Sequence, residues 1–115
     1  MIIEKNITKY IAFAEENVIN ALKKISDNGC GLIFSVTDAG ELEGVLSNGD
    51  FRRWLLNNPT IDLNQPLSNV SKKEFVFAYE YDSPAQIESR FCDWIDYIPL
   101  VTRQRRIVAI ARKRK

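Results

Sequence analysis

Apolar residues in the first part of the chain recur at the spacing of an amphipathic helix. Val18, Leu22 and Ile25 occupy positions i, i+4 and i+7, which fall on one buried helix face. Asn17 is a residue type that caps helix starts, and an Asn-Gly pair at 28–29 is typical of helix ends. The pattern therefore predicts a helix between these two positions.

Two mainly apolar runs, at 32–36 and 97–101, predict short buried strands. Turn residues follow each run and lead to a second apolar stretch, at 42–46 and 107–111. Because a short turn joins the two strands of each pair, both pairs are expected to form β-hairpins.

The order of these elements repeats along the chain. Residues 10–16 read Tyr-Ile-Ala-Phe-Ala-Glu-Glu and residues 75–80 read Phe-Val-Phe-Ala-Tyr-Glu, so two Phe-Ala pairs lie 64 residues apart. Each pair precedes a helical pattern and a hairpin; in the second copy, residues 83–86 supply a serine cap, a first-turn proline and a capping box. A further helix over 50–56 is predicted in the first copy only.

The repeat predicts the domain organisation. We expect a first domain over 1–58, a polar linker over 59–73 with a short helical turn docked on the core, and a second domain over 74–115 without the final helix. A unit of about 55 residues buries too little surface to be secure alone. The two copies are therefore expected to pack as one pseudo-symmetric module of the mixed α/β (α+β) class.

Composition limits the chemistry that the chain can perform. Its 115 residues are 45% hydrophobic and 27% charged, which suits a folded domain, and no apolar stretch approaches the roughly 18 residues of a membrane span. The sequence has no histidine, which excludes Ser-His and Cys-His catalysis and histidine metal sites. No P-loop, paired-carboxylate motif or metal-ligand spacing stands out, so we expect no catalytic residue, no metal site and no required cofactor.

Cysteine usage and the absence of a visible signal peptide favour a reducing cytoplasm, with Cys30 and Cys92 free and buried rather than joined. Charge is uneven, because residues 1–102 hold nine Lys/Arg and fifteen Asp/Glu, whereas residues 103–115 hold seven Lys/Arg and no acid. This basic end either attracts phosphates or is a solvated strand that continues into a basic linker. Nucleic-acid binding is the weaker interpretation, because no recognition helix is visible.

One junction between a predicted strand and a predicted helix carries a family pattern. The segment Gly44-Val45-Leu46-Ser47-Asn48-Gly49-Asp50 has the order Gly, hydrophobic residue, any residue, Ser or Thr, two further residues, Asp. Placed within an internal repeat, this segment resembles the cystathionine-β-synthase (CBS) domain, and the resemblance covers nearly the whole chain. Two CBS domains in tandem form a Bateman module. The resemblance therefore implies a regulatory module that dimerises and performs no reaction.

A narrower likeness concerns the segments 2–7 and 43–54. They look like the CBS pair that precedes a sialic-acid-synthase-like catalytic domain in some bacterial proteins, and related pairs accompany sugar nucleotidyltransferases. This likeness implies that the chain modulates an attached or partner enzyme of sugar biosynthesis. It also admits a cytidine nucleotide as the ligand.

The resemblance implies one adenine-nucleotide site (AMP, ADP or ATP) in the first copy. Asp50 at a helix start is suited to accept two hydrogen bonds from a ribose, and Ser47 lies where backbone N–H groups and the helix dipole favour a phosphate. Arg52 and Arg53 are candidates for phosphate contact, and Gly44 would let a base or ribose approach the strand. The candidates for nucleotide binding are Ala12, Phe13, Phe34, Gly44, Val45, Ser47, Asn48, Asp50, Arg52 and Arg53.

Each candidate also has a structural interpretation. Ser47 would serve only as a helix cap, Asp50 only as a first-turn acid, and the two phenylalanines only as core residues. Trp54 and Trp94 are expected to pack in the core or at a dimer face.

The second copy lacks the family pattern. The residues that stand in place of Gly44, Val45, Ser47 and Asp50 are Ala109, Ile110, Arg112 and Lys115. Without a carboxylate for a ribose, one working site per chain is expected. Arg112 and Lys115 would either contact phosphates at the neighbouring site or block the second cleft.

Two classes of function stay open at this point. The first is a ligand-sensing module that binds a nucleotide and acts as a homodimer on an attached or partner enzyme. The second is a structural dimerisation module without a ligand. The sequence selects neither the ligand nor the direction of regulation.

Overall fold

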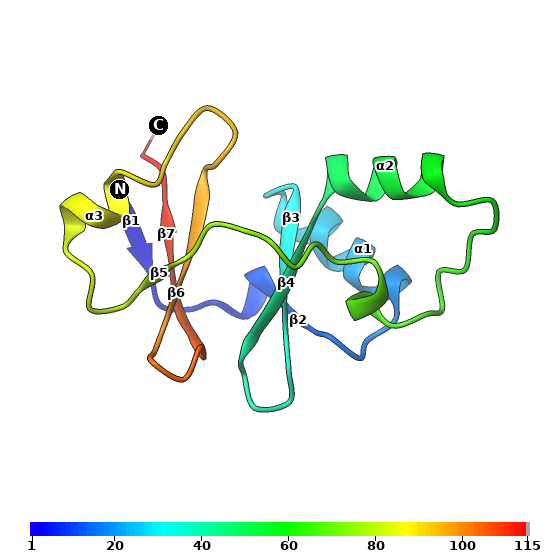
Figure 1. Cartoon of the computed structure of the whole chain (residues 1–115), viewed down its shortest axis with the longest axis horizontal. Helices are drawn as coiled ribbons and strands as arrows, with labels where there is room; N and C mark the ends of the chain where they lie inside the picture. Colours follow the sequence, from blue (N-terminus) through cyan, green and yellow to red (C-terminus); the bar gives the residue numbers. More distant parts are fainter. Residues whose placement is uncertain (115) are drawn as a thin grey trace. The chain divides into compact units, whose positions relative to one another are not determined.

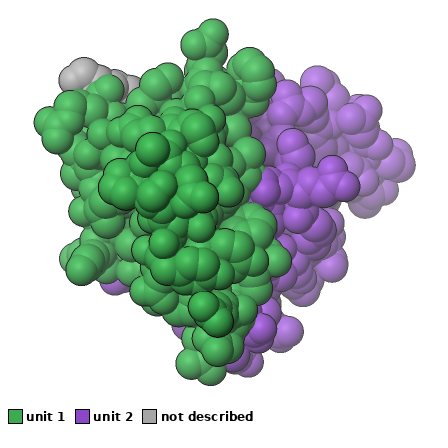
Figure 2. All heavy atoms as spheres, turned by 60° about the vertical axis from the view of Figure 1, so that its left-hand side comes forward, with its two compact units in different colours: residues 1–7, 76–115 green, residues 8–75 purple. Residues whose placement is uncertain are grey.

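A computed structural model describes residues 1–114 of the chain, which form two compact units (Figure 2). The central unit comprises residues 8–75. The terminal unit comprises residues 1–7 together with residues 76–115. This division differs from the expected boundaries, because the first seven residues join the second half of the chain and residues 59–73 join the first.

The central unit holds a three-stranded sheet with two helices (Figure 1). Its elements are η1 (Thr8–Tyr10), β2 (Ile11–Phe13), α1 (Val18–Asn28), β3 (Leu32–Val36), β4 (Leu42–Ser47), α2 (Asn48–Asn57) and η2 (Leu67–Asn69). Strand β2 runs parallel to β3, and β3 and β4 form the predicted antiparallel hairpin. The core of this unit contains the fully buried residues Ala21, Ile33, Leu46 and Leu67.

Helix α1 begins and ends where the sequence predicts. The Asn17 side chain accepts a hydrogen bond from the backbone N–H of Asn20 at 3.2 Å, and Gly29 closes the helix in the left-handed conformation with φ 67°. Val18, Ala21 and Ile25 point into the core.

Residues 59–73 are an integral part of the central unit and not a linker. The backbone N–H groups of Val18 and Ile19 donate to the carbonyls of Gln65 and Leu63, both at 3.0 Å. Leu67 in η2, the predicted helical turn, is fully buried. This segment satisfies donors at the start of α1 that would otherwise lack partners.

The terminal unit holds a four-stranded sheet in the order β1-β7-β6-β5. Its elements are β1 (Ile2–Glu4), β5 (Ala78–Tyr79), α3 (Pro84–Glu88), β6 (Tyr97–Val101) and β7 (Ile107–Arg112). The predicted capping box is present at α3, where Ser83 and Gln86 exchange hydrogen bonds. Strand β1 pairs antiparallel with β7, so that Ile3 faces Ala111.

Strand registers confirm the internal repeat and correct its alignment. Gly44 lies opposite Ser35 as Ala109 lies opposite Leu100, and both hairpins have an irregularity at the next pair. In the first strands, however, Ala12 pairs with Ser35 and Ala78 pairs with Leu100. Ala12 therefore corresponds to Ala78 and Phe13 to Tyr79, so matching the two Phe-Ala pairs was wrong by two residues.

No helix among residues 1–114 is long and apolar enough to cross a membrane.

Candidate functional site

The junction between β4 and α2 places Ser47 and Asp50 together. Ser47 is the N-cap of α2, with φ −104° and ψ 164°, and its hydroxyl accepts the backbone N–H of Asp50 at 3.0 Å. Asp50 lies in the first turn, where its carboxylate pairs with the guanidinium of Arg53. Ser47 therefore serves as a helix cap and Asp50 as a first-turn acid, and both side chains lie at the start of the same helix.

The electrostatic environment keeps Asp50 ionised. Burial of the carboxyl raises its pKa, but the hydrogen bonds from Arg53 and Ser47 and the positive charges of Arg53 and Lys72 lower the pKa below its usual value overall. An ionised carboxylate accepts hydrogen bonds and does not donate them. This is the state that a pair of ribose hydroxyls requires.

Lys72 belongs to this site although the sequence did not single it out. Val45 and Lys72 exchange two backbone hydrogen bonds, of 3.0 and 2.8 Å, so the segment 71–73 runs along the free edge of β4. This pairing brings the charge of Lys72 near Asp50. The sequence signal that could have found it is the Lys-Lys pair at 72–73, just before the second copy.

The segment 71–73 is held by an ion pair with several hydrogen bonds. The Glu43 carboxylate accepts from the hydroxyls of Ser35 at 2.6 Å and Ser71 at 3.1 Å, and it pairs with Lys73. Burial raises the pKa of Glu43, but the bond and charge of Lys73 and the two serine hydroxyls lower it below its usual value overall. Glu43 thus holds the two neighbours of Lys72, Ser71 and Lys73, in place against β4.

Gly44 serves the fold, and this corrects the expectation that it opens the strand to a ligand. A Cβ at this position would lie 2.8 Å from the Ser71 hydroxyl and 2.9 Å from the Lys72 carbonyl. The space above Gly44 is therefore filled by the protein's own chain, because the segment 71–73 lies directly against the strand.

The central unit does not bring the predicted apolar slot to Asp50. Ala12 and Phe34 are buried in the core, with 1% and 2% exposure, and cannot contact a ligand without rearrangement. Phe13 is 48% exposed but lies at the other end of the sheet, because it pairs with Val36 whereas Ser47 pairs with Leu32. The parallel pairing of β2 and β3 causes this separation.

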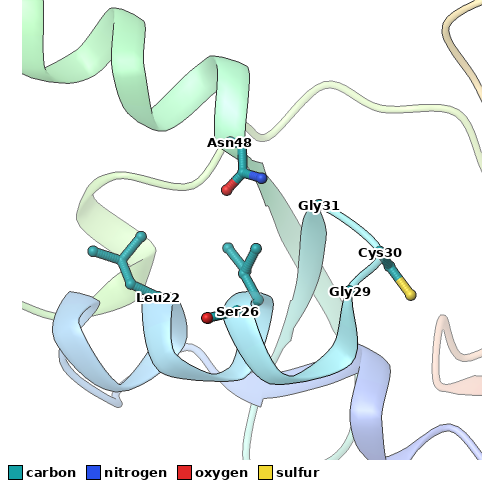
Figure 3. Close-up of a pocket in the computed structure, with 7 residues that line it drawn as sticks. Leu22, Ser26, Gly29, Cys30, Gly31 and Asn48 are labelled. Carbon is teal, nitrogen blue, oxygen red and sulfur yellow. The ribbon is translucent and has the colours of Figure 1, made fainter.

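A hollow of about 430 Å³ lies between the end of α1 and the start of α2 (Figure 3). Its lining residues are Leu22, Ile25, Ser26, Gly29, Cys30, Gly31 and Asn48. Of the predicted candidates only Asn48 lines it, with its amide directed toward the space (Figure 3). The hollow adjoins the Ser47–Asp50 turn through Asn48, whose N–H donates to the Gly31 carbonyl at 2.9 Å.

The remaining candidates lie on the surface. Arg52 is exposed on α2, Val45 is half-buried on β4, and Arg53 is exposed but bound to Asp50. Arg53 would have to release the carboxylate for a ribose to bind as expected.

The second copy has no equivalent of this site among the described residues. Arg112 pairs with Tyr97 in the sheet as Ser47 pairs with Leu32, and its guanidinium lies 3.5 Å from the Glu4 carboxylate on β1. Ala109 and Ile110 are buried. The predicted phosphate contact of Lys115 lies outside the described residues.

Cysteines and tryptophans depart in part from expectation. Cys30 and Cys92 are free, as predicted, but both are half-buried. Trp54 is half-buried and stacks on Phe51 at 5.8 Å between ring centroids, whereas Trp94 is 83% exposed within the described unit. No group of three or more metal-ligating side chains occurs in the part of the chain that the structure describes.

Solved structures identify the fold. One of them comprises the CBS domains of a transcriptional regulator from Streptococcus pneumoniae, with a TM-score of 0.76 and 11% identity over 96% of this chain and 88% of that one. A CBS domain pair/ACT domain protein from Thermotoga maritima gives 0.73 and 16%, over 89% and 79% of the two chains. CbpB from Listeria monocytogenes, solved in complex with c-di-AMP, gives 0.74 and 15%, over 89% and 78%.

These likenesses define a class of fold. The chain has the mixed α/β fold of a tandem CBS domain pair, which confirms the resemblance drawn from its repeat and from the segment 44–50. No family model and no curated protein matches the sequence. The narrower likeness to pairs that accompany sialic-acid-synthase-like enzymes stays a prediction.

Proposed function

We propose that this chain is a regulatory module that binds an adenine nucleotide at the start of α2. The observation that carries the proposal is the ionised Asp50 carboxylate, held in the first turn beside the Ser47 hydroxyl and near the Lys72 ammonium. The carboxylate suits ribose hydroxyls, and the cation with the helix start suits a phosphate. The module itself performs no reaction in this proposal.

The comparison with CbpB supports the class of ligand. That protein has the same fold and was solved with c-di-AMP, which consists of two adenine nucleotides. We therefore include cyclic dinucleotides with AMP, ADP and ATP among the ligands of this chain. A cytidine nucleotide is the alternative that the likeness to sugar-biosynthesis proteins favours.

The proposed readout is a change in the geometry of a homodimer. A ligand that binds one arrangement of the paired modules more tightly than another shifts their populations by its difference in affinity. An enzyme attached to the module or docked on it, of the sugar-biosynthesis class under the narrower likeness, would follow that shift.

The test is thermal unfolding of the whole chain with AMP, ADP, ATP, c-di-AMP, CMP and CTP, each at about 1 mM. A ligand with a dissociation constant near 10 μM adds about 2.7 kcal/mol, which raises the Tm of a domain of this size by several degrees. Asp50→Ala should abolish the shift, because it removes the ribose acceptor. Glu15→Gln, an exposed acid of the same unit, should leave the shift unchanged.

A second candidate function is ligand-free dimerisation. Helix α2 buries none of its residues within the described chain, and Leu56 on it is 81% exposed. Gly44, Ser47 and Asp50 all have roles in the fold, and these roles account for the three residues without a bound ligand. If no nucleotide shifts the Tm while sedimentation shows a stable dimer, this second function replaces the first.

A further inference from the structure

Three aromatic rings in the terminal unit form a row with an arginine at each end. Tyr79 and Tyr81 stack with centroids 5.1 Å apart and 15° between their planes, and Phe77 meets Tyr79 edge-on at 5.6 Å. The guanidinium of Arg103 lies 5.2 Å from the centre of the Tyr81 ring, and that of Arg105 lies 4.3 Å from the centre of Phe77. We call these five residues the Tyr–Arg row.

Arg105 occupies a backbone position that favours glycine. Its φ is 69°, in the left-handed region, and its N–H donates to Thr102 in the turn between β6 and β7. In the matching turn of the central unit the same position holds Gly40, whose φ is 83° and whose N–H donates to Thr37. The turn imposes this conformation and forms equally well with glycine, so the turn does not require an arginine at this strained position.

The side chain of Arg105 is also incompletely satisfied. Within residues 1–114, its Nε is buried without a hydrogen-bond partner. In the same described range, none of the three arginines of this turn, Arg103, Arg105 and Arg106, takes part in an ion pair. Asp82, which lies next to Tyr81 in the sequence, accepts a hydrogen bond from the Tyr79 N–H at 2.9 Å and forms an ion pair with Arg90 at 3.9 Å.

The corresponding end of the central unit has a different chemistry. By the strand and turn registers, Ile11, Phe13 and Glu15 stand in place of the three rings, and Asp38 stands in place of Arg103. The same fold thus forms without an aromatic row and without arginine. The terminal unit is also the basic half of the molecule, with nine Lys/Arg against six Asp/Glu.

We propose that the Tyr–Arg row binds a nucleoside phosphate, either as a free nucleotide or within single-stranded nucleic acid. A guanidinium stacked on a ring keeps its N–H donors in its own plane, where they match the oxygens of a phosphate. Tyr81 is 56% exposed, with Tyr79 stacked on its ring and the Arg103 guanidinium over it, so a base would stack on the outer side of that guanidinium. Sites that bind single strands without sequence preference stack bases on aromatic side chains and neutralise the backbone phosphates with positive charges, including arginines in cation–π contacts.

The test uses the whole chain with Asp50→Ala, so that the site at α2 does not contribute. Binding of a 5′-fluorescein-labelled 12-nucleotide dT strand is followed by anisotropy at low salt, and binding of AMP and UMP by calorimetry. Arg103→Gln and Arg105→Gly should each weaken binding about tenfold, because each removes a guanidinium that lies over a ring. Arg105→Gly keeps the turn, as Gly40 does in the central unit.

Arg106→Gln is the matched control, because it removes the same charge from the same turn without touching a ring. It should weaken binding by no more than about twofold. Tighter binding of the strand than of the mononucleotides assigns the site to single strands, and equal affinity assigns it to free nucleotides. Absence of saturable binding to every probe, or an equal loss with Arg106→Gln and Arg103→Gln, would overturn the proposal.

Discussion

Because Gly44 is a glycine and has no side chain, the segment 71–73 can lie directly against β4. The nearest neighbours of a Cβ at this position include the Lys72 carbonyl at 2.9 Å, which is backbone and cannot rotate away. The glycine therefore determines whether the segment that carries Lys72 can pair with the strand.

Gly44→Ala should reduce the free energy of unfolding by about 1–3 kcal/mol, because the strand and the segment 71–73 must separate. Urea denaturation measures this loss. Gly49→Ala is the control, because the nearest atom to its Cβ would be 3.6 Å away and alanine favours a helix. Equal stability of Gly44→Ala and the wild type would show that the contact is not tight.

Glu43 makes the stability of the central unit depend on pH. Its folded pKa lies below the unfolded value of 4.5, so the carboxylate contributes stability that is complete above that value and is lost as the pH falls through the folded pKa. Glu43→Gln should therefore flatten the decline of unfolding free energy as the pH falls below the unfolded value of 4.5. Glu41→Gln, an exposed acid two residues earlier, should retain the decline.

At the scale of elements, the sequence predicted helix α1, both hairpins and the capping box of α3, because local periodicity and cap residues determine them. It predicted that a helical turn of 59–73 docks on the core, but it missed the pairing of this segment with the start of α1, because backbone hydrogen bonds such as Val18 to Gln65 leave no pattern in side-chain types. It also missed the separation of Phe13 from Asp50, which follows from a strand register that spacing alone does not reveal.

Substitutions can test whether the segment 59–73 belongs to the packed core of the central unit. Leu67→Ala should reduce the free energy of unfolding by about 2–5 kcal/mol, because the side chain is fully buried. Leu56→Ala on α2, where the side chain is 81% exposed, should change it by no more than about 0.5 kcal/mol in the monomer. Chemical denaturation compares the two, and a silent Leu67→Ala would restore the interpretation of this stretch as a linker.

At the scale of the whole molecule, both sheets protect their last strand with a segment from elsewhere in the chain. Residue 72 covers β4 in the central unit, and β1 covers β7 in the terminal unit. Because Val45 and Ile110 hold matching registers, Lys72 and Glu4 occupy equivalent places in the two sheets. The repeat therefore includes the segment that precedes each first strand.

Deletion of residues 1–7 should expose the edge of β7 and remove the pair between Glu4 and Arg112. Hydrogen exchange at residues 110–112 should become faster, while the β3–β4 hairpin keeps its protection, because its own edge is covered by residue 72. The substitution Glu4→Gln, which retains β1, should leave exchange at β7 close to that of the wild type. Unchanged exchange after the deletion would mean that β1 does not protect the strand.

The pairing of β1 with β7 also has a consequence for synthesis. Ile2 finds its partner only at Arg112, so the terminal sheet cannot close until residue 112 has left the ribosome. Residues 8–75 contain all the strands of their own sheet and can fold earlier. The unit with the α2 site is thus expected to form first on the ribosome, while β1 has to wait for β7.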